Sequence, residues 1–505
     1  MRKHNFSRTA SRSLIAAACA LTCLAAQAAV AVVAAPVTKI TIVSRDAPGV
    51  GFNDPTVVAP VGGNPGTTLG EQRMNVYRYV ADIWQQNLTS PVEIKVSAGW
   101  EALSCSATSA TLGSAAAWNI WHDFAGGQPG TWYPQALANK LAGINLSDGQ
   151  PDDGSGYGNF DIKTQFNVNL GNANCLTGST FYLGLDGNAG SNVNFAATLL
   201  HELGHGLGFS VLTVNTTNGY RVDPTGSNYV ANGGLPSIWE RYMYDNTQGR
   251  TWLNMTNAQR AASAINPLAL AWNGPIATAG AISMLSQTPI VKSSSPAGVV
   301  PNVTFSASAF GPALPTAGKL GVLALVTTQN AATGPGCDAF NAANTAAVAG
   351  KVALISRGTC TFAVKVKNAQ NAGAVAVLLI NNVAGAIAPG GADATVTIPS
   401  AGLSLADGQT LTAAVTAAKP YGTRAVAGTV TATLATDPTR LAGADAAGRP
   451  LLYTPNPLVG GSSVSHWDVS AFPNLLMEPN INADLTLTVV PPKDLTKPLL
   501  QDIGW

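Results

Sequence analysis

The chain has 505 residues, of which only 10% are charged, and its formal net charge is +1 at pH 7. This length predicts two or three domains rather than a single core. The sequence contains neither a basic run nor a basic stripe, which argues against a nucleic-acid partner.

The N-terminus, residues 1–28, has the pattern of a cleaved secretory signal. Basic residues precede an apolar stretch over 14–26, and Ala26-Gln27-Ala28 fits a small-residue cleavage site. The alternative is a membrane anchor, but the apolar stretch is short for a span, and no later apolar run is long enough to cross a bilayer. We therefore expect a secreted protein cleaved near Ala28, with the periplasm as the alternative location.

Residues 37–285 favour a mixed α/β structure. Apolar residues spaced three and four apart predict a helix over 71–86, and alternation predicts a strand over 91–97. Residues 160–170 predict a second strand, with a change of phase that would fit a bulge, and 181–185 a third short one.

Residues 201–209 read His-Glu-Leu-Gly-His-Gly-Leu-Gly-Phe, which contains H-E-x-x-H followed by x-x-G. On a helix, His201 and His205 lie one turn apart on the same face, so both rings can bind one metal ion. Glu202 lies about 100° round the helix, where it can act as general base on a metal-activated water. The preceding residues are apolar and predict a buried helix, for which Asn194 is a candidate N-cap.

A catalytic zinc site normally has three protein ligands and one open position. The simple metzincin continuation would place the third histidine at position 211, but this residue is Val211. The residues alone leave several candidates for the third ligand: His466, His122, Asp223, Glu240 and Glu478.

Two segments resemble the leishmanolysin family of zinc peptidases, which are metzincins. The first is 201–209, and the second is Ser465-His466-Trp467-Asp468, followed eleven residues after His466 by Met477. In that family an insertion displaces the third histidine far downstream, and a methionine in the Met-turn forms a hydrophobic floor beneath the metal.

This resemblance implies an α+β fold with a metzincin-like zinc protease catalytic domain. It implies one catalytic Zn²⁺ bound by His201, His205 and His466, with Met477 beneath it and Glu202 as the catalytic base. Water activated by zinc would then hydrolyse the peptide bond.

Residues 286–435 differ in character, since they contain neither histidine nor tryptophan and are rich in Ala and Val. Strands are expected over 319–326, 351–355 and 374–380, with a helix over 362–372. This strand–helix–strand pattern suggests a small α/β module.

Gly350-Lys351-Val352-Ala353-Leu354-Ile355-Ser356-Arg357-Gly358-Thr359-Cys360-Thr361-Phe362 and Gly373-Ala374-Val375-Ala376-Val377 resemble the protease-associated (PA) domain. The resemblance implies a PA domain at 286–435, inserted between catalytic parts at 29–285 and 436–505. In relatives such a domain is thought to bind peptide or gate the catalytic cleft. An insertion is acceptable if its two ends lie close together.

Four cysteines follow the signal segment, which suggests two disulfides in an exported chain. Three pairings are possible, and we favour Cys105–Cys175 and Cys337–Cys360 because each stays within one expected domain. A structural Ca²⁺ at Asp148, Asp152 and Asp153 is an alternative to a solvated acidic loop.

These features favour a secreted zinc endopeptidase that acts on protein or peptide substrates. The alternatives are a peptide-binding pseudoenzyme that acts through the PA domain, and a zinc aminopeptidase, although the two-metal carboxylates common in such enzymes do not occur near the motif. By analogy with relatives, 160–170 or 181–185 could be an edge strand that pairs with extended substrate. Residues 29–70 could form a pro-segment without a cysteine latch.

Overall fold

A computed structural model describes residues 37–149, 160–212, 221–222, 229–230, 234–315, 317–391, 393–418, 428–482 and 485–505. The expected signal segment and three of the acidic candidates, Asp152, Asp153 and Asp223, lie outside the described residues. Over the part of the chain that is described, no helix combines the length and the apolar character needed to cross a bilayer.

A four-stranded sheet forms the framework of the N-terminal region, in the order β1 (Ile40–Ser44), β2 (Ile94–Glu101), β8 (Ile162–Asn167), β5 (Gly113–Ala117). The first three strands are parallel, and β5 runs antiparallel to β8 at the edge. The expected bulge in 160–170 is wrong, because β8 pairs with β2 in continuous register from Ile162 to Asn167.

The same sheet order excludes β8 as the strand that accepts substrate, since both of its edges are already paired. The other expected candidate, 181–185, forms only the short strand β9 (Phe181–Tyr182), which pairs with β10 (Val193–Asn194). The free edge near the metal-site helix belongs to β5, a strand of small residues that the sequence did not reveal.

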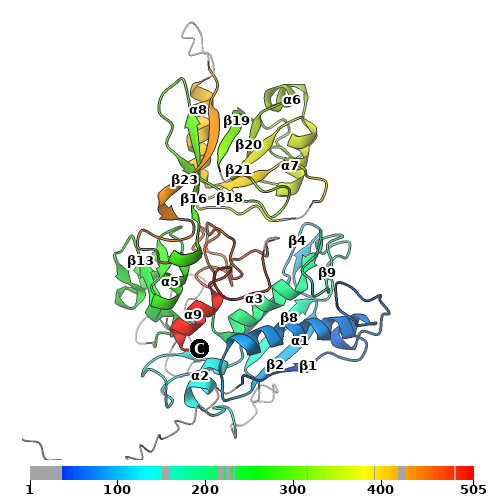
Figure 1. Cartoon of the computed structure of the whole chain (residues 1–505), viewed down its shortest axis with the longest axis vertical. Helices are drawn as coiled ribbons and strands as arrows, with labels where there is room; N and C mark the ends of the chain where they lie inside the picture. Colours follow the sequence, from blue (N-terminus) through cyan, green and yellow to red (C-terminus); the bar gives the residue numbers. More distant parts are fainter. Residues whose placement is uncertain are drawn as a thin grey trace, which may run out of the picture. The chain divides into compact units, whose positions relative to one another are not determined.

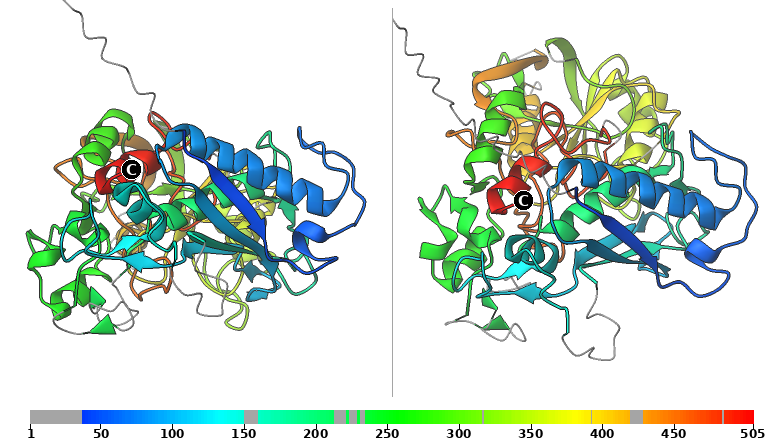
Figure 2. Two further views of the ribbon diagram at one scale, coloured as in Figure 1. Left: turned by 90° about the horizontal axis from the view of Figure 1, so that it is seen from below. Right: turned by 60° about the horizontal axis from the view of Figure 1, so that its bottom comes forward.

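Two helices, α1 (Leu69–Asn87) and α3 (Phe195–Leu207), pack against this sheet and against each other (Figures 1 and 2). A capping box between Thr68 and Glu71 begins α1. Aromatic side chains fill the space between the helices and the sheet, where ring centroids of Tyr77 and Phe166 lie 6.0 Å apart. The expected helix over 71–86 is therefore present, with two extra residues at its start and one at its end.

The core of this region also contains residues from the end of the chain. One buried cluster joins Leu203 and Trp239 with Trp467, Met477 and Leu499. Helix α9 (Thr496–Ile503) contacts α5 (Pro275–Met284), whose first turn donates two backbone N–H groups to the Asp502 carboxylate. Segments before residue 286 and after residue 441 thus build one core.

The intervening segment forms an eight-stranded sheet of its own, seen in Figure 1 around the labels β16, β18 to β21 and β23. Its strands are, in spatial order, β17 (Val303–Thr304), β16 (Gln287–Ser294), β23 (Thr431–Leu441), β19 (Gly318–Leu325), β20 (Val352–Ser356), β21 (Ala376–Ile380), β22 (Ser400–Leu403) and β18 (Ser306–Ala307).

The central strands β19, β20, β21 and β22 are parallel and covered on both faces. Alternate residues of β20 and β21 enter two separate cores: one includes α8 (Leu405–Ala417), and the other includes α6 (Ala342–Val348) and α7 (Phe362–Asn371). Burial on both faces explains why these strands read as continuous apolar runs.

The two ends of this inserted segment lie next to each other. Strands β16 and β23 pair antiparallel, with Gln287 opposite Leu441 and Thr288 opposite Asp437. Strand β23 continues six residues past the expected boundary at 435, because it follows its partner β16 down to the point where the chain entered. Adjacent ends allow a module to be inserted without disturbing the host fold.

The remaining described elements are short. They are β3 (Cys105–Ser106), β4 (Ser109–Ala110), β6 (Ile120–Trp121), β7 (Tyr133–Pro134), α2 (Gln135–Ala142), β11 (Arg221–Val222), β12 (Tyr229–Val230), β13 (Met243–Asp245), β14 (Arg250–Thr251), α4 (Asn257–Ser263), β15 (Leu270–Trp272) and three 3₁₀ turns, Gly51–Asn53, Trp239–Tyr242 and Trp252–Asn254.

Candidate metal centre

Helix α3 places two of the candidate ligands. The Asn194 side chain accepts the Ala197 backbone N–H at 3.1 Å, so this residue is the N-cap that the sequence suggests. The helix is buried nearly all round, and it ends at Gly208, whose φ of 122° suits glycine. A helix surrounded by core holds its histidines in fixed positions.

Three histidines meet at one point. His205 Nε2 lies 3.1 Å from His201 Nε2 and 3.1 Å from His466 Nε2. His201 and His466 are each only 5% exposed. In the described part of the chain, these three residues form the one group of three or more potential metal ligands.

The outer nitrogens of the three rings decide which tautomer each histidine adopts. His201 Nδ1–H donates to the Leu476 carbonyl at 2.7 Å, and His205 Nδ1–H donates to the Phe209 carbonyl at 2.7 Å. His466 Nδ1–H donates to the Ser462 carbonyl at 2.8 Å. A neutral imidazole has one proton, so each Nε2 carries a lone pair.

The lone pair of His205 therefore faces each of the other two across 3.1 Å, an arrangement that is repulsive unless a cation lies between the three rings. Protonation does not relieve it, because burial lowers the pKa of His201 to about 4 and that of His205 to about 3. Burial and the two neighbouring rings also hold the pKa of His466 well below its usual value. Three neutral imidazoles with carbonyl-bound outer nitrogens fit a bound Zn²⁺.

Glu202 lies beside this centre on the next position of α3. Its side chain is 9% exposed, and it accepts the Ala115 backbone N–H from the edge strand β5. Burial raises the pKa of the Glu202 carboxyl to about 8, although the Ala115 bond works in the opposite direction. A carboxyl in this setting can take up and release a proton near neutral pH.

Met477 is fully buried under the helix. A Cβ added at Gly204 would lie 2.8 Å from the Met477 sulfur, so glycine allows the close approach of this side chain to α3. The Met477 carbonyl accepts the Trp467 backbone N–H at 2.9 Å, which ties this turn to the neighbour of His466.

The turn before Met477 is anchored by a residue that the sequence analysis missed. The Asp494 carboxylate, 2% exposed, accepts the backbone N–H of Leu476 at 2.7 Å and that of Thr496 at 2.7 Å. Leu476 in turn accepts the His201 proton. A backbone carbonyl that accepts a hydrogen bond can belong to any residue type, so the sequence does not mark it. Asp494 appears in the sequence only as an acidic residue before a helix.

The other candidates for the third ligand lie elsewhere. His122 Nδ1 lies 2.6 Å from an Asp123 carboxylate oxygen, and the His122 ring packs on Trp132. Glu240 accepts the Ser237 backbone N–H, and Glu478 accepts the Leu475 backbone N–H. Asp148 is exposed, and the calcium hypothesis stays untested because its partner residues are not described.

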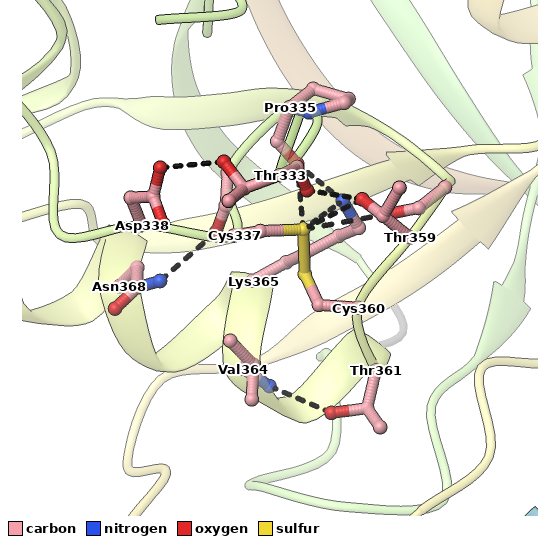
Figure 3. Close-up of a disulfide and its surroundings, with 12 residues drawn as sticks. Thr333, Pro335, Cys337, Asp338, Thr359, Cys360, Thr361, Val364, Lys365 and Asn368 are labelled. Carbon is pink, nitrogen blue, oxygen red and sulfur yellow. Dashed lines mark hydrogen bonds between the residues drawn. A yellow bond between two sulfur atoms is a disulfide. The ribbon is translucent and has the colours of Figure 1, made fainter. Parts of the chain in front are cut away.

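Two disulfides have the pairing favoured from the sequence. Cys105–Cys175 links β3 to the segment after β8, and Cys337–Cys360 lies within the inserted segment (Figure 3). Disulfides of this kind persist in oxidising compartments.

Comparison with known proteins identifies the inserted segment. Residues 320–411 match the family model of the PA domain, so the chain contains a PA domain. This match covers a minority of the chain and does not assign the metal-site region to a family.

The probable leucine aminopeptidase 2 of Aspergillus fumigatus is 53% identical over 66 residues, which are 12% of this chain and 13% of that protein. This chain thus spans about an eighth of the relative's length.

Two solved structures are also similar over part of the chain. A zinc aminopeptidase from Bacillus subtilis has 24% identity and a TM-score of 0.20, over 31% of this chain and 35% of its own. An aminopeptidase from Aneurinibacillus has 24% identity and a TM-score of 0.19, over 32% and 36%.

Proposed function

We propose that this protein is a secreted, zinc-dependent endopeptidase. The observation that carries the proposal is the meeting of three Nε2 lone pairs, with every Nδ1–H held by a backbone carbonyl, next to the buried Glu202. Such a centre supplies three protein ligands, the number that a catalytic zinc site combines with one open position.

Zinc bound there would supply Lewis acidity that polarises the scissile carbonyl and acidifies water. Glu202 takes the proton from the attacking water and then delivers a proton to the leaving amine. Burial raises the pKa of the Glu202 carboxyl, which favours return of the proton to the leaving amine. The positive charge of a zinc ion beside it would favour the carboxylate form, which acts first as base. The Ala115 N–H holds the carboxyl toward β5.

Strand β5 is the candidate for substrate alignment. It lies at the sheet edge, and one of its backbone groups reaches Glu202, so an extended peptide paired along β5 would pass the base. Its sequence, Gly-Ser-Ala-Ala-Ala, leaves the approach open because the side chains are small.

A zinc aminopeptidase is the second candidate, because the similar curated protein is a probable leucine aminopeptidase. Among the described residues, however, no Asp or Glu joins the three histidines to form a second metal position. The presence of a PA domain is compatible with an endopeptidase and with an aminopeptidase, so it does not distinguish the two candidates.

The test is hydrolysis of a peptide mixture by the zinc-loaded full chain, with fragments identified by mass spectrometry. Each peptide is supplied with a free and with an acetylated N-terminus. Internal cuts in both forms are expected, whereas stepwise loss of residues from free N-termini alone would establish the aminopeptidase instead.

Two variants make this test specific. Glu202→Gln should retain zinc and lose roughly 10²–10⁴-fold in kcat, the usual contribution of a general base. Glu240→Gln, which alters a buried carboxyl away from the histidines, is the matched control and should retain activity. Zinc-loaded wild type without any cleavage would favour the peptide-binding pseudoenzyme.

A further inference from the structure

The Cys337–Cys360 disulfide of the PA domain has chemically unequal sulfur atoms. It joins the loop before α6 to the residue that precedes the N-cap of α7, Thr361 (Figure 3). The sulfur of Cys337 is surrounded by polar atoms, including Lys365 Nζ at 3.4 Å and Thr359 Oγ1 at 3.2 Å. For Cys360 Sγ, the described residues supply no comparable hydrogen-bond donor.

Lys365 is the group that distinguishes Cys337. Its side chain projects from α7 into the protein and is 0% exposed, and its ammonium donates to the Pro335 carbonyl and points at the Cys337 sulfur. Among described residues, no carboxylate forms an ion pair with it, and burial lowers its pKa to about 8. A buried cation without a counter-ion is stabilised by any negative charge that develops beside it.

The neighbouring polar and charged groups are already engaged. The Thr359 hydroxyl donates to the Thr333 carbonyl, so its proton is not directed at the sulfur. The Asp338 carboxylate accepts from Thr333 and Asn330, and Arg357 lies over the Phe362 ring. The Lys365 ammonium is therefore the one described cation that contacts either sulfur.

The segment that carries Cys360 lies at the surface of the PA domain. Both cysteines are half-buried, whereas Thr359 and Thr361, which flank Cys360, are exposed. Val364, one turn into α7, is 40% exposed. In thiol–disulfide exchange the rate rises when the leaving thiol has a low pKa, and a nearby lysine lowers the pKa of a cysteine.

We propose that Cys337–Cys360 is a thiol-exchange site for a low-molecular-weight thiol, with Cys360 as the sulfur attacked and Cys337 as the leaving thiolate. The incoming thiolate forms a bond to Cys360 Sγ, and the electron pair of the broken S–S bond goes to Cys337 Sγ beside the Lys365 ammonium. A second thiolate then attacks the mixed disulfide, which releases the oxidised small disulfide and the Cys360 thiolate. Two thiols thus supply the two electrons.

The experiment uses the full chain and isotope-labelled glutathione near neutral pH, quenched with acid and analysed by peptide mass spectrometry. The mixed disulfide should form on Cys360 at least about tenfold more than on Cys337, since the leaving-group preference follows the difference in thiol pKa. Cys105–Cys175 is an internal control, because the contact to Cys175 Sγ is a neutral amide, Asn167 Nδ2 at 3.4 Å. It should exchange more slowly.

Variants separate charge from packing. Lys365→Met should slow the exchange and abolish the preference, and Lys365→Arg should keep it. Lys367→Met, which removes a lysine of the same helix that bonds the Thr395 carbonyl, should behave as wild type. If Lys365→Met does not fold, as judged by thermal melting, the test uses Lys365→Arg and the wild type. Both must then show the preference for an adduct on Cys360.

Adducts that are equal on both sulfurs or mainly on Cys337 would overturn the proposal. It would also be overturned by exchange no faster than at Cys105–Cys175, and by the lack of any adduct.

Discussion

At the scale of single residues, the tautomer and orientation of each histidine are set by a hydrogen bond to the backbone. Carbonyls of Leu476, Phe209 and Ser462 take the three Nδ1 protons, and this leaves three Nε2 lone pairs with a common focus. The donors belong to side chains and the acceptors to the backbone, so the site is built jointly by the sequence motif and by loops far from it.

Replacing the third histidine tests this arrangement. His466→Ala should reduce bound zinc from about one equivalent to well below one and abolish hydrolysis, because two imidazoles cannot complete a three-ligand site. His122→Ala removes a histidine that pairs with Asp123 and should leave zinc content unchanged. Metal analysis of both purified proteins checks the prediction, and full zinc in the His466 variant would refute the ligand assignment.

The sequence predicts these residues to different degrees. His201, Glu202 and His205 were predicted from spacing alone, because one helix sets their geometry locally. His466 lies 261 residues from His205. The residues alone left it as one of several candidates, and a family resemblance selected it. The supporting Asp494 could not be predicted, since its role depends on a turn that the tertiary fold brings to His201.

At the scale of elements, the segment from Leu475 to Met477 connects the two halves of the metal centre. Its Leu476 carbonyl orients His201, its Met477 carbonyl binds the Trp467 N–H next to His466, and its Leu476 N–H is held by Asp494. A displacement of this one turn would therefore move two of the proposed ligands, His201 and His466, together.

Asp494→Asn should weaken zinc binding by roughly tenfold or more, as loss of outer-shell partners does. The matched control is Asp502→Asn, because Asp502 also accepts two backbone N–H groups but supports α5 instead. Zinc release to a chelator should quicken in the first variant alone. If the two variants lose the same thermal stability and release zinc at the same rate, Asp494 has only a structural role.

Strand assignments show where local patterns stop being informative. Alternation in 160–170 correctly predicted a strand, yet it could not reveal that β8 has partners on both sides. Sheet order depends on which segments meet, and β5, with its small residues, lacks the β-branched and aromatic residues that mark strands. Strands β20 and β21 were easier to predict, because burial on both faces requires a continuous run of apolar residues.

At the scale of the whole molecule, the chain builds its metal-site core from two segments and places a PA domain between them. Strands β16 and β23 pair with each other, with Thr288 opposite Asp437. This pairing brings the two ends of the insertion together. The large separation of His205 from His466 in sequence therefore imposes no large separation in space.

The stability of the whole fold should depend on pH through Asp161. Burial raises the pKa of this carboxyl to about 6 in the folded protein, against about 3.9 when unfolded. Between these values the folded state binds more protons than the unfolded state, so the Asp161 contribution falls as pH rises from about 4 to about 6. The change is roughly 1–3 kcal/mol in the free energy of unfolding.

Urea unfolding of wild type and Asp161→Asn across this range measures the effect. The difference in stability, wild type minus variant, should decline with rising pH through the window and level off above it. A difference that is constant with pH would show that Asp161 does not titrate in this way.

Zinc-edge X-ray absorption of the zinc-loaded protein tests the central claim most directly, because it counts and identifies the atoms around the metal. Three imidazole nitrogens at about 2.0–2.1 Å and one oxygen are predicted for the site formed by His201, His205 and His466. A shell that contains sulfur, or fewer than three imidazoles, would contradict the three-histidine centre and the peptidase mechanism built on it.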